Sequence, residues 1–323
     1  MTDSYAIQIE QTGGTEVLQR VDITPRTPNA GEALVRMEAV GLNFIDTYFR
    51  SGLYPARMPF TPGSEGAGIV EAIGEGVDHI AVGDRVALMG SGAYTTHFTG
   101  TAATMVALPE DVSAEAGAAL LLKGLTAWML LFEIRPIKAK DTVLIWAPVG
   151  GVGSILTPWA AHLGARVIAV TSTDEKAAQA KALGASDVIV GYDGVADKVR
   201  ALTDGAGVDV SLDSVGKISA DASLSSLKQR GWFISYGNAS GAVDPIAPGR
   251  LAQGGSLIMT RPSLFNFIGG PGEMARGADM MFGALKDGVF DVAIGQRFAL
   301  SDVAAAHTAL ESGKTTGATV LVP

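Results

Sequence analysis

The chain has 323 residues, and its 24 Lys and Arg stand against 33 Asp and Glu, which gives a formal net charge of -9. This length suffices for two domains, and the acidic balance argues against nucleic acid or an anionic membrane as a general partner. The absence of cysteine excludes disulfides, thiolate nucleophiles and thiolate metal sites. The N-terminus lacks the basic start and apolar run of a secretory signal, so we expect a cytoplasmic protein.

Residues 1 to about 110 contain short strand-like runs broken by Gly, Pro and Asn, which predicts a β-rich domain. The runs are residues 5–9, 33–40, 68–73, 84–88 and 105–108. The glycine-rich stretch 63–68 precedes a strand and no helix follows it. We therefore interpret this stretch as tight turns in a barrel-like sheet rather than as a phosphate cradle.

Residues 43–54 contain a short predicted helix with Asn43, Asp46 and Arg50 on one face. The simplest interpretation makes Asn43 the helix cap and places Asp46 in the first turn, each serving only the backbone. Two apolar helices, 113–122 and 126–132, are expected next and meet at a Lys-Gly joint. We interpret them as buried helices rather than as a membrane span, because charged residues interrupt and flank the stretch.

Residues 142–163 have the pattern of a strand, a glycine turn and a helix start, with Gly150, Gly151 and Gly153 in the turn. Backbone amides and the positive helix end at such a turn can hold a pyrophosphate. Further strand candidates and intervening helices follow, which predicts a doubly wound parallel sheet. The strands are 143–145, 166–170, 187–190, 208–212, 232–235 and 256–259, and the helices after the turn are 154–163, 174–183, 196–202 and 219–227.

The chain after residue 262 leaves this alternation, with a predicted helix at 273–285, a strand at 297–300, a capped helix at 301–310 and a strand at 318–322. We expect this tail to rejoin the N-terminal part. The predicted fold is α/β: a six-stranded parallel Rossmann sheet, residues 125–263, inserted in a discontinuous β-rich domain of residues 1–124 and 264–323. A cleft between the two domains would suit a ligand.

The order of the motifs resembles that of the medium-chain dehydrogenases/reductases over essentially the whole chain. The shared motifs are Asn-Phe-Ile-Asp at 43–46, Arg-Ser-Gly-Leu-Tyr-Pro at 50–55, Gly-Ser-Glu-Gly-Ala-Gly-Ile-Val at 63–70, Gly-Asp-Arg-Val at 83–86, Leu-Lys-Gly-Leu-Thr at 122–126, the glycine turn, Ser-Tyr-Gly-Asn-Ala-Ser-Gly at 235–241 and Arg-Pro-Ser-Leu at 261–264. The chain is most similar to the zinc-free, NADPH-dependent quinone oxidoreductases, the zeta-crystallin-like branch. The resemblance implies a GroES-like β-rich domain and a homodimer paired through the edge strand at about 256–260.

The zinc-dependent branch of this superfamily holds a catalytic metal with cysteine, histidine and a carboxylate. Here Ser64 stands where that branch has the histidine before the glutamate. The four histidines, at positions 79, 97, 162 and 307, have no ligand spacing. We therefore expect no metal, and we expect each histidine to be a surface or core residue.

The second strand of the predicted sheet ends without the acidic residue that NAD-preferring sheets carry there. Small Ser172 leaves room for a 2′-phosphate and Lys176 can supply positive charge, so we expect NADPH as the cofactor. The resemblance implies that Ser172, Lys176 and Tyr192 line the phosphate pocket. A structural interpretation, in which Ser172 and Glu175 form a capping box, is compatible with this role.

The resemblance also implies which residues face the nicotinamide and hold the rest of the cofactor. Tyr54 is the candidate for a hydroxyl that donates a hydrogen bond or a proton to the reduced oxygen, and Asn43 and Asp46 complete the expected catalytic set. The expected cofactor-binding residues are Asn43, Asp46, Thr126, Gly150, Gly151, Val152, Ser172, Lys176, Tyr192, Ser214, Asn238, Ser240 and Phe265.

The leading functional expectation is a metal-free NADPH:quinone oxidoreductase. An enal or enoyl reductase of the same superfamily is the alternative, because such enzymes need a proton donor near the carbonyl, often a tyrosine where Tyr54 stands. A third possibility, from another class, is an NADPH-binding sensor or structural protein with little turnover.

Overall fold

The computed structural model describes residues 4–270 and 272–323. They form two compact units. The first contains the chain up to Leu125, Met274–Phe282 and Val292–Pro323, and the second contains Thr126–Glu273 and Gly283–Asp291. The first unit is therefore discontinuous in sequence. The exact limits given above for the two domains stay a prediction.

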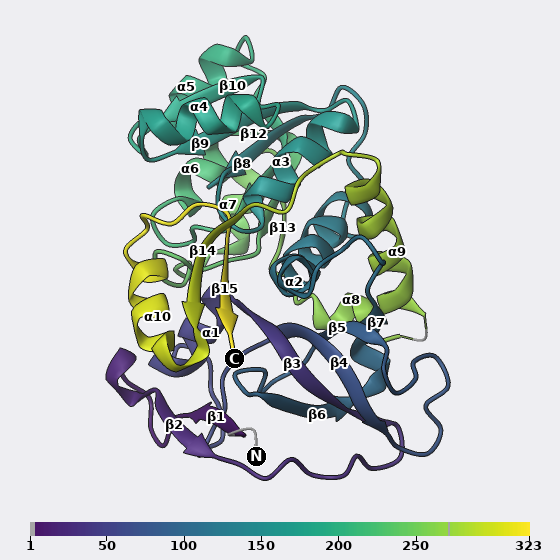
Figure 1. Cartoon of the computed structure of the whole chain (residues 1–323). Helices are drawn as coiled ribbons and strands as arrows, with labels where there is room; N and C mark the ends of the chain where they lie inside the picture. Colours follow the sequence, from purple (N-terminus) through teal and green to yellow (C-terminus); the bar gives the residue numbers. More distant parts are fainter. Residues whose placement is uncertain (1–3, 271) are drawn as a thin grey trace. The chain divides into compact units, whose positions relative to one another are not determined.

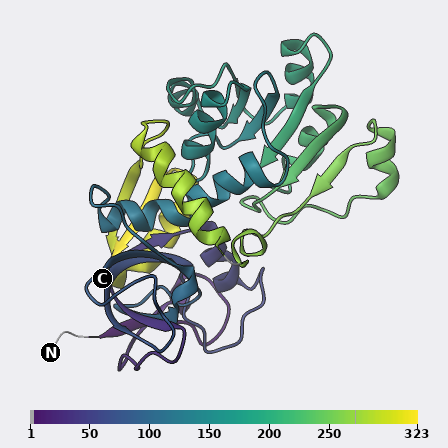
Figure 2. The same ribbon diagram turned by 90° about the vertical axis from the view of Figure 1, so that its right-hand side faces the viewer.

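The first unit is built around a seven-stranded sheet with the order β14-β15-β3-β4-β5-β7, and β6 also pairs with β3. Strand β15 pairs antiparallel with β3, which confirms that the C-terminal tail rejoins the N-terminal part (Figure 1 and Figure 2). The strands of this sheet are β3 (Glu32–Leu42), β4 (Glu65–Ile73), β5 (Arg85–Met89), β6 (His97–Thr101), β7 (Met105–Ala107), β14 (Ile294–Ala299) and β15 (Ala318–Val322). Strands β1 (Tyr5–Gln8) and β2 (Gln19–Asp22) form a separate antiparallel pair.

The glycine-rich stretch 63–68 is mostly strand, so its interpretation as tight turns was wrong beyond Gly63, which has a φ of 98°. A Cβ on Gly68 would lie 2.0 Å from the carbonyl oxygen of Arg36, and one on Gly66 would lie 2.2 Å from the Cε of Met37. Glycine is therefore needed at position 68, where the backbone of β3 lies against β4, whereas the flexible end of Met37 can move away from a side chain at position 66.

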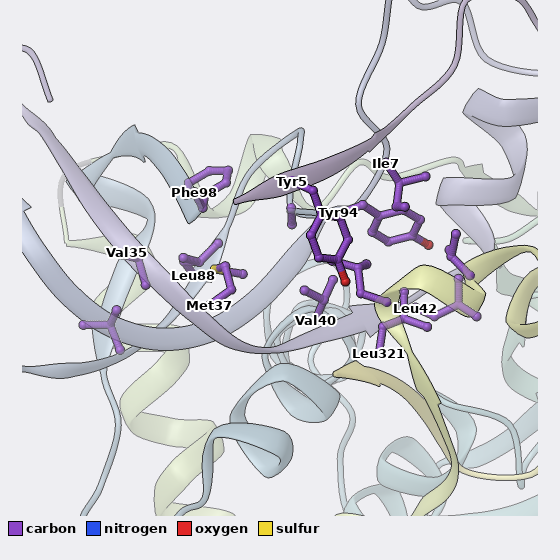
Figure 3. Packing of buried hydrophobic residues seen from close by; sticks show 14 of the residues in the cluster. Tyr5, Ile7, Val35, Met37, Val40, Leu42, Leu88, Tyr94, Phe98 and Leu321 are labelled. Atoms are coloured by element: carbon purple, nitrogen blue, oxygen red, sulfur yellow. The ribbon is translucent and has the colours of Figure 1, made fainter. Parts of the chain in front are cut away.

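The core of the first unit is an apolar cluster between the sheet and the N-terminal strands. Tyr5, Ile7, Leu42, Tyr94 and Leu321 converge in it from segments far apart in sequence (Figure 3). The helices of this unit are α1 (Phe44–Ser51), α10 (Val303–Glu311), most of α2 (Ala114–Trp128) and part of α9 (Glu273–Lys286).

Helix α2 runs without a break through Lys123 and Gly124, and a π-helical turn continues it over Met129–Glu133. The prediction of two helices meeting at a Lys-Gly joint was wrong. A Cβ on Gly124 would lie 2.3 Å from the Sδ of Met281, so this glycine serves helix packing rather than a break. By length and composition the segment Ala114–Glu133 could cross a membrane, but 78% of its most apolar window is buried inside the structure, as in the core helix of a globular protein.

The second unit contains six parallel strands in the order β10-β9-β8-β11-β12-β13, which confirms the doubly wound Rossmann sheet. The strands are β8 (Thr142–Trp146), β9 (Arg166–Thr171), β10 (Asp187–Val190), β11 (Val208–Asp213), β12 (Leu227–Ser235) and β13 (Ile258–Thr260). The helices are α3 (Gly153–His162), α4 (Asp174–Ala182), α5 (Val195–Leu202), α6 (Ala220–Ser225), α7 (Pro248–Gln253) and α8 (Phe265–Ile268). The strand order reverses between β8 and β11, which is where such sheets bind their ligands.

Candidate active site

Most of the predicted cofactor-binding residues of the second unit follow the carboxyl ends of its strands. Parallel strands end at one common edge of the sheet, so the fold brings these residues to that edge. Gly150, Gly151 and Val152 follow β8, Ser172 follows β9, Tyr192 follows β10, Ser214 follows β11, Asn238 and Ser240 follow β12, and Phe265 follows β13. Their contact with a cofactor stays a prediction.

The glycine turn after β8 leads directly into the ten-residue helix α3. Gly150 N–H donates to the carbonyl of Ala147 at 3.1 Å, and Ser154 N–H donates to the carbonyl of Gly150 at 2.8 Å. A Cβ on Gly153 would lie 2.1 Å from the oxygen of Ala147, so only glycine fits where the turn meets the helix. The turn thus has the close packing that a pyrophosphate cradle at a helix N-terminus requires.

The loop after β9 leaves the Ser172 hydroxyl outside the cap of helix α4. The N-cap is Thr173, whose Oγ1 accepts a hydrogen bond from Lys176 N–H at 3.3 Å, so the prediction of a capping box from Ser172 and Glu175 was wrong. Ser172 is exposed and Lys176 lies in the first turn. An exposed hydroxyl followed by an ammonium group fits a 2′-phosphate, although Asp174 and Glu175 in the same turn oppose its charge.

The buried carboxylate of Asp213 holds the loop after β11, and backbone hydrogen bonds from Ala239 and Ser240 join the loop after β12 to it. The carboxylate accepts hydrogen bonds from the backbone N–H groups of Val215 and Gly216 and from the hydroxyls of two serines in the following segment. Its burial raises its pKa. A Cβ on Gly237 would lie 2.4 Å from the carbonyl oxygen of Ser214, so the two loops touch through backbone atoms. Ser214 and Asn238 therefore lie on two loops that are in contact.

In the first unit, Asp46 lies in α1 and is completely buried. Its carboxylate accepts hydrogen bonds from Asn43 N–H at 2.9 Å, from Ser64 Oγ at 2.7 Å and from Tyr94 Oη at 3.1 Å. The bond from Asn43 N–H is the expected capping contact. The interpretation that Asn43 and Asp46 serve only the backbone was wrong, because both also bind side chains from other segments.

The burial of Asp46 raises the pKa of its carboxyl to about 6, because desolvation outweighs the hydrogen bonds from Ser64, Asn43 and Tyr94, which lower it. The nearby negative charge of Glu65 raises it further. Asp46 therefore changes its charge just below neutral pH.

A second buried carboxylate, Glu65, links Asn43 to helix α2. Its Oε1 accepts hydrogen bonds from Asn43 Nδ2 at 2.8 Å and from Lys123 Nζ at 2.6 Å, and its Oε2 accepts one from Leu122 N–H at 2.7 Å. Lys123 is buried, and Thr126 lies one turn further along the same helix. We did not predict a role for Glu65 or Lys123. The signal was present, since a lysine within an apolar helix is almost never buried without a charged partner.

Tyr54 follows α1 after Gly52, which ends the helix in a left-handed conformation. Its N–H donates to the carbonyl of Tyr48 at 3.1 Å, and its ring contacts the rings of Tyr48 and Phe49 at centroid distances of 5.3 and 5.7 Å. Tyr54 is half-buried and held against α1. It therefore shares the same short segment as Asn43 and Asp46, while Arg50 pairs with Glu311.

Two family models match the chain: an alcohol dehydrogenase GroES-like domain over residues 29–116 and a zinc-binding dehydrogenase over residues 151–282. Within residues 4–270 and 272–323, no group of three or more His, Asp or Glu could hold a metal ion. Ser64 donates its hydroxyl proton to Asp46.

Several proteins that are similar to this chain along its whole length are named as oxidoreductases. A quinone oxidoreductase of Pseudomonas aeruginosa is 44% identical over 98% of this chain and 99% of its own. A 2-haloacrylate reductase of a Burkholderia species is 38% identical over 98% of both chains. The solved structure of Escherichia coli quinone oxidoreductase complexed with NADPH has a TM-score of 0.96 and 40% identity, and it covers 99% of this chain and 100% of that one. The chain therefore belongs to the quinone oxidoreductase family of the medium-chain dehydrogenases/reductases.

Proposed function

We propose that this protein is an NADPH-dependent quinone oxidoreductase that works without a metal. The observation that carries this proposal is the carboxyl edge of the parallel sheet, with its glycine turn before α3 and no acidic residue at the tip of β9. The similarity to quinone oxidoreductases, one of them solved with NADPH, supports the same function. When bound, NADPH supplies the hydride.

The residues present fit this cofactor. The amides at Gly150, Gly151 and Val152 would hold the pyrophosphate, and Ser172 with Lys176 would hold the 2′-phosphate. Tyr192, Ser214, Asn238, Ser240 and Phe265 would line the rest of the edge. Asn43, Asp46 and Thr126 would face the nicotinamide.

In this proposal the substrate quinone meets the segment that carries Asn43 and Tyr54. The Tyr54 hydroxyl would donate a hydrogen bond to the oxygen on which negative charge develops, and Asn43 would orient the substrate. A hydroquinone exchanges protons readily with water, so a general acid in the protein is not compulsory. Tyr54 therefore assists the reaction rather than enabling it.

Replacing Lys176 tests the phosphate site. Lys176→Ala should weaken NADPH binding by roughly tenfold to a hundredfold, the worth of one charge-assisted contact, and should leave NADH binding nearly unchanged. Fluorescence titrations with both cofactors measure this. Lys181→Ala, the same change of charge at the other end of helix α4, is the control. Equal losses for NADPH and NADH would remove Lys176 from the site.

Replacing Tyr54 tests its assisting role. Tyr54→Phe should lower kcat for quinone reduction about threefold to thirtyfold, because one neutral hydrogen bond to the developing charge is lost. Turnover should persist. Tyr5→Phe, at a buried tyrosine in another segment, is the control. Kinetics identical to those of the unmodified protein would show that Tyr54 does not contact the substrate.

The experiment that tests the function is the oxidation of NADPH and of NADH with a simple para-quinone and with a conjugated enal. Fast oxidation of NADPH by the quinone, with NADH much slower, is the expected result. The similarity to a 2-haloacrylate reductase favours an alkene reductase as the second candidate. Turnover with the enal alone would establish that candidate, and tight NADPH binding without turnover would favour the sensor or structural protein.

The free edge of the second unit supports a homodimer in this proposal. Strand β13 is the last strand of its sheet, and Ile258 on it is 38% exposed. An edge strand of this kind offers unpaired backbone groups to a second copy. Sedimentation of the whole chain tests this proposal, and the cytoplasmic location stays a prediction.

A further inference from the structure

Beyond the residues assigned above, a chain of buried polar side chains leads from Asp46 to helix α10. Tyr94 Oη lies 3.1 Å from Asp46 Oδ2 and 2.9 Å from His307 Nε2. His307 Nδ1 lies 3.1 Å from Arg50 Nη1, and the guanidinium also binds both carboxylate oxygens of Glu311, at 3.0 and 2.7 Å. We call Arg50, His307, Tyr94 and Asp46 the donor chain.

The direction of the hydrogen bonds in the donor chain is fixed by chemistry. A guanidinium has only donors, so His307 Nδ1 must accept from Arg50, and in a neutral imidazole Nε2 then carries the proton. His307 Nε2 therefore donates to Tyr94 Oη, and the Tyr94 hydroxyl donates its own proton to Asp46. Burial and the charge of Arg50 lower the pKa of His307 to about 3, so the ring is neutral at pH 7.

The hydrogen bonds of the donor chain hold the Asp46 carboxylate in place, and they do not form a path for proton transfer. An arginine side chain does not release its proton in a protein, so no proton can pass between Glu311 and His307 through Arg50. Each donor in the chain instead points toward Asp46. Ser64 Oγ and Asn43 N–H add two more donors to the same carboxylate, so its ionised form is the form that these bonds favour.

The charged and titratable groups around Asp46 come from each element packed against it. Arg50 on α1 and His307 on α10 lie behind Tyr94, and Glu65 on β4 lies on the other side with Lys123 of α2 as its partner. Within the part of the chain that the structure describes, Glu65 is the negatively charged side chain that raises the pKa of Asp46. Lys123 offsets the charge of Glu65, and the hydrogen bond from Tyr94, at the end of the donor chain, is one of three that favour the ionised form of Asp46 against its desolvation.

We propose that His307 and Tyr94 are positioning residues of the active site, which hold the Asp46 carboxylate ionised and in one orientation, and with it the Asn43 end of helix α1. This inference rests on the proposed function, because that function assigns Asn43 and Asp46 to the nicotinamide side. The C-terminal helix α10 thus becomes part of the catalytic apparatus without touching substrate.

The test titrates the Asp46 carboxyl by infrared spectroscopy in the whole protein, with Asp46→Asn to assign its band. Tyr94→Phe should raise the titration midpoint by about one to two pH units, since one hydrogen bond to an ionised group is worth roughly tenfold or more in proton affinity. His307→Leu should raise it by a smaller amount, because the Tyr94 hydroxyl still donates to Asp46 but loses the donor that polarises it. His307→Gln, whose amide can accept from Arg50 and donate to Tyr94, should restore the midpoint. If Tyr94→Phe does not fold, the two His307 variants carry the comparison.

The kinetic arm compares the pH profile of kcat/KM for quinone reduction in the same variants. The acid limb should move upward with the infrared midpoint, while kcat/KM at pH 9 should change less than about twofold. Tyr5→Phe, which removes a hydroxyl from the same apolar cluster but not from the donor chain, should change neither (Figure 3). Identical midpoints in all variants would overturn the inference. Absence of turnover in the unmodified protein would refute the proposed function. The infrared titration would then still decide whether His307 and Tyr94 control the ionisation of Asp46.

Discussion

Lys123→Met should lower the free energy of unfolding by about 3 to 5 kcal/mol at pH 7, because it leaves the Glu65 carboxylate buried without its charged partner. The Nζ of Lys123 lies 2.6 Å from Glu65 Oε1, with both side chains shielded from water. Methionine keeps most of the volume of the lysine stem, so the loss reflects charge rather than packing. Urea unfolding at constant pH measures it.

The double variant Lys123→Met/Glu65→Gln should recover a large part of this loss, since no buried charge then remains unpaired. Arg26→Met is the matched control, because the Arg26 and Glu32 pair has the same N to O distance of 2.6 Å but an arginine side chain that is 50% exposed. That variant should cost less than about 1 kcal/mol. Equal losses in Lys123→Met and Arg26→Met would show that burial does not strengthen the Glu65 pair.

His307→Gln should make the protein more resistant to acid than the unmodified chain. The unfolded histidine takes up a proton near pH 6.5, whereas the folded one resists it until about pH 3. Between these values the unfolded state binds more protons, so the stability of the unmodified protein falls as the pH falls. The difference between the two proteins should grow from zero above pH 7 to at most about 5 kcal/mol near pH 3.

Asp46→Asn should reveal a smaller effect of opposite sign, which serves as an internal check. The folded carboxyl has its pKa raised from 3.8 to about 6, so the folded state binds the extra proton as the pH falls through this window. This protonation stabilises the unmodified protein relative to Asp46→Asn by at most about 3 kcal/mol at pH 4, and the gain is lost as the pH rises above 6. Thermal unfolding from pH 3 to 8 measures both variants, and parallel curves for all three proteins would contradict both assignments.

The six strands of the second unit could be predicted from the sequence, whereas the short helices α7 and α8 and the early start of β12 at Leu227 could not. A parallel strand buried on both faces must be apolar along its length, so Val143–Trp146 and its neighbours stand out without any long-range information. The helix that follows most strands predicts that the sheet is parallel. Gly150 and Gly153 then mark the edge of the sheet at which a ligand binds. Local periodicity and turn residues are sufficient to predict a sheet of this kind, because it is built from short strand-helix segments that repeat along the chain.

The errors occurred where one residue type serves two structural purposes. Gly124 suggested a helix break, but the helix continues through it and Met281 packs against it across a helix interface. Gly68 suggested a turn, but it is required because the backbone of β3 lies against it. Ser172 suggested a cap, while the neighbouring Thr173 forms it. In each case the local pattern allows both uses, and only the packing partner distinguishes them.

The sequence by itself determined the class of fold, the edge of the sheet that would bind a dinucleotide and the segment that carries Asn43 and Asp46. Only the tertiary structure decided that Glu65 and Lys123 pair in the interior, and that His307, 261 positions after Asp46 by its number in the chain, is linked to it through Tyr94. Such links join residues with no common period or motif. The physical reason is that a buried charge must find its partners wherever the fold places them, and sequence spacing does not record that choice.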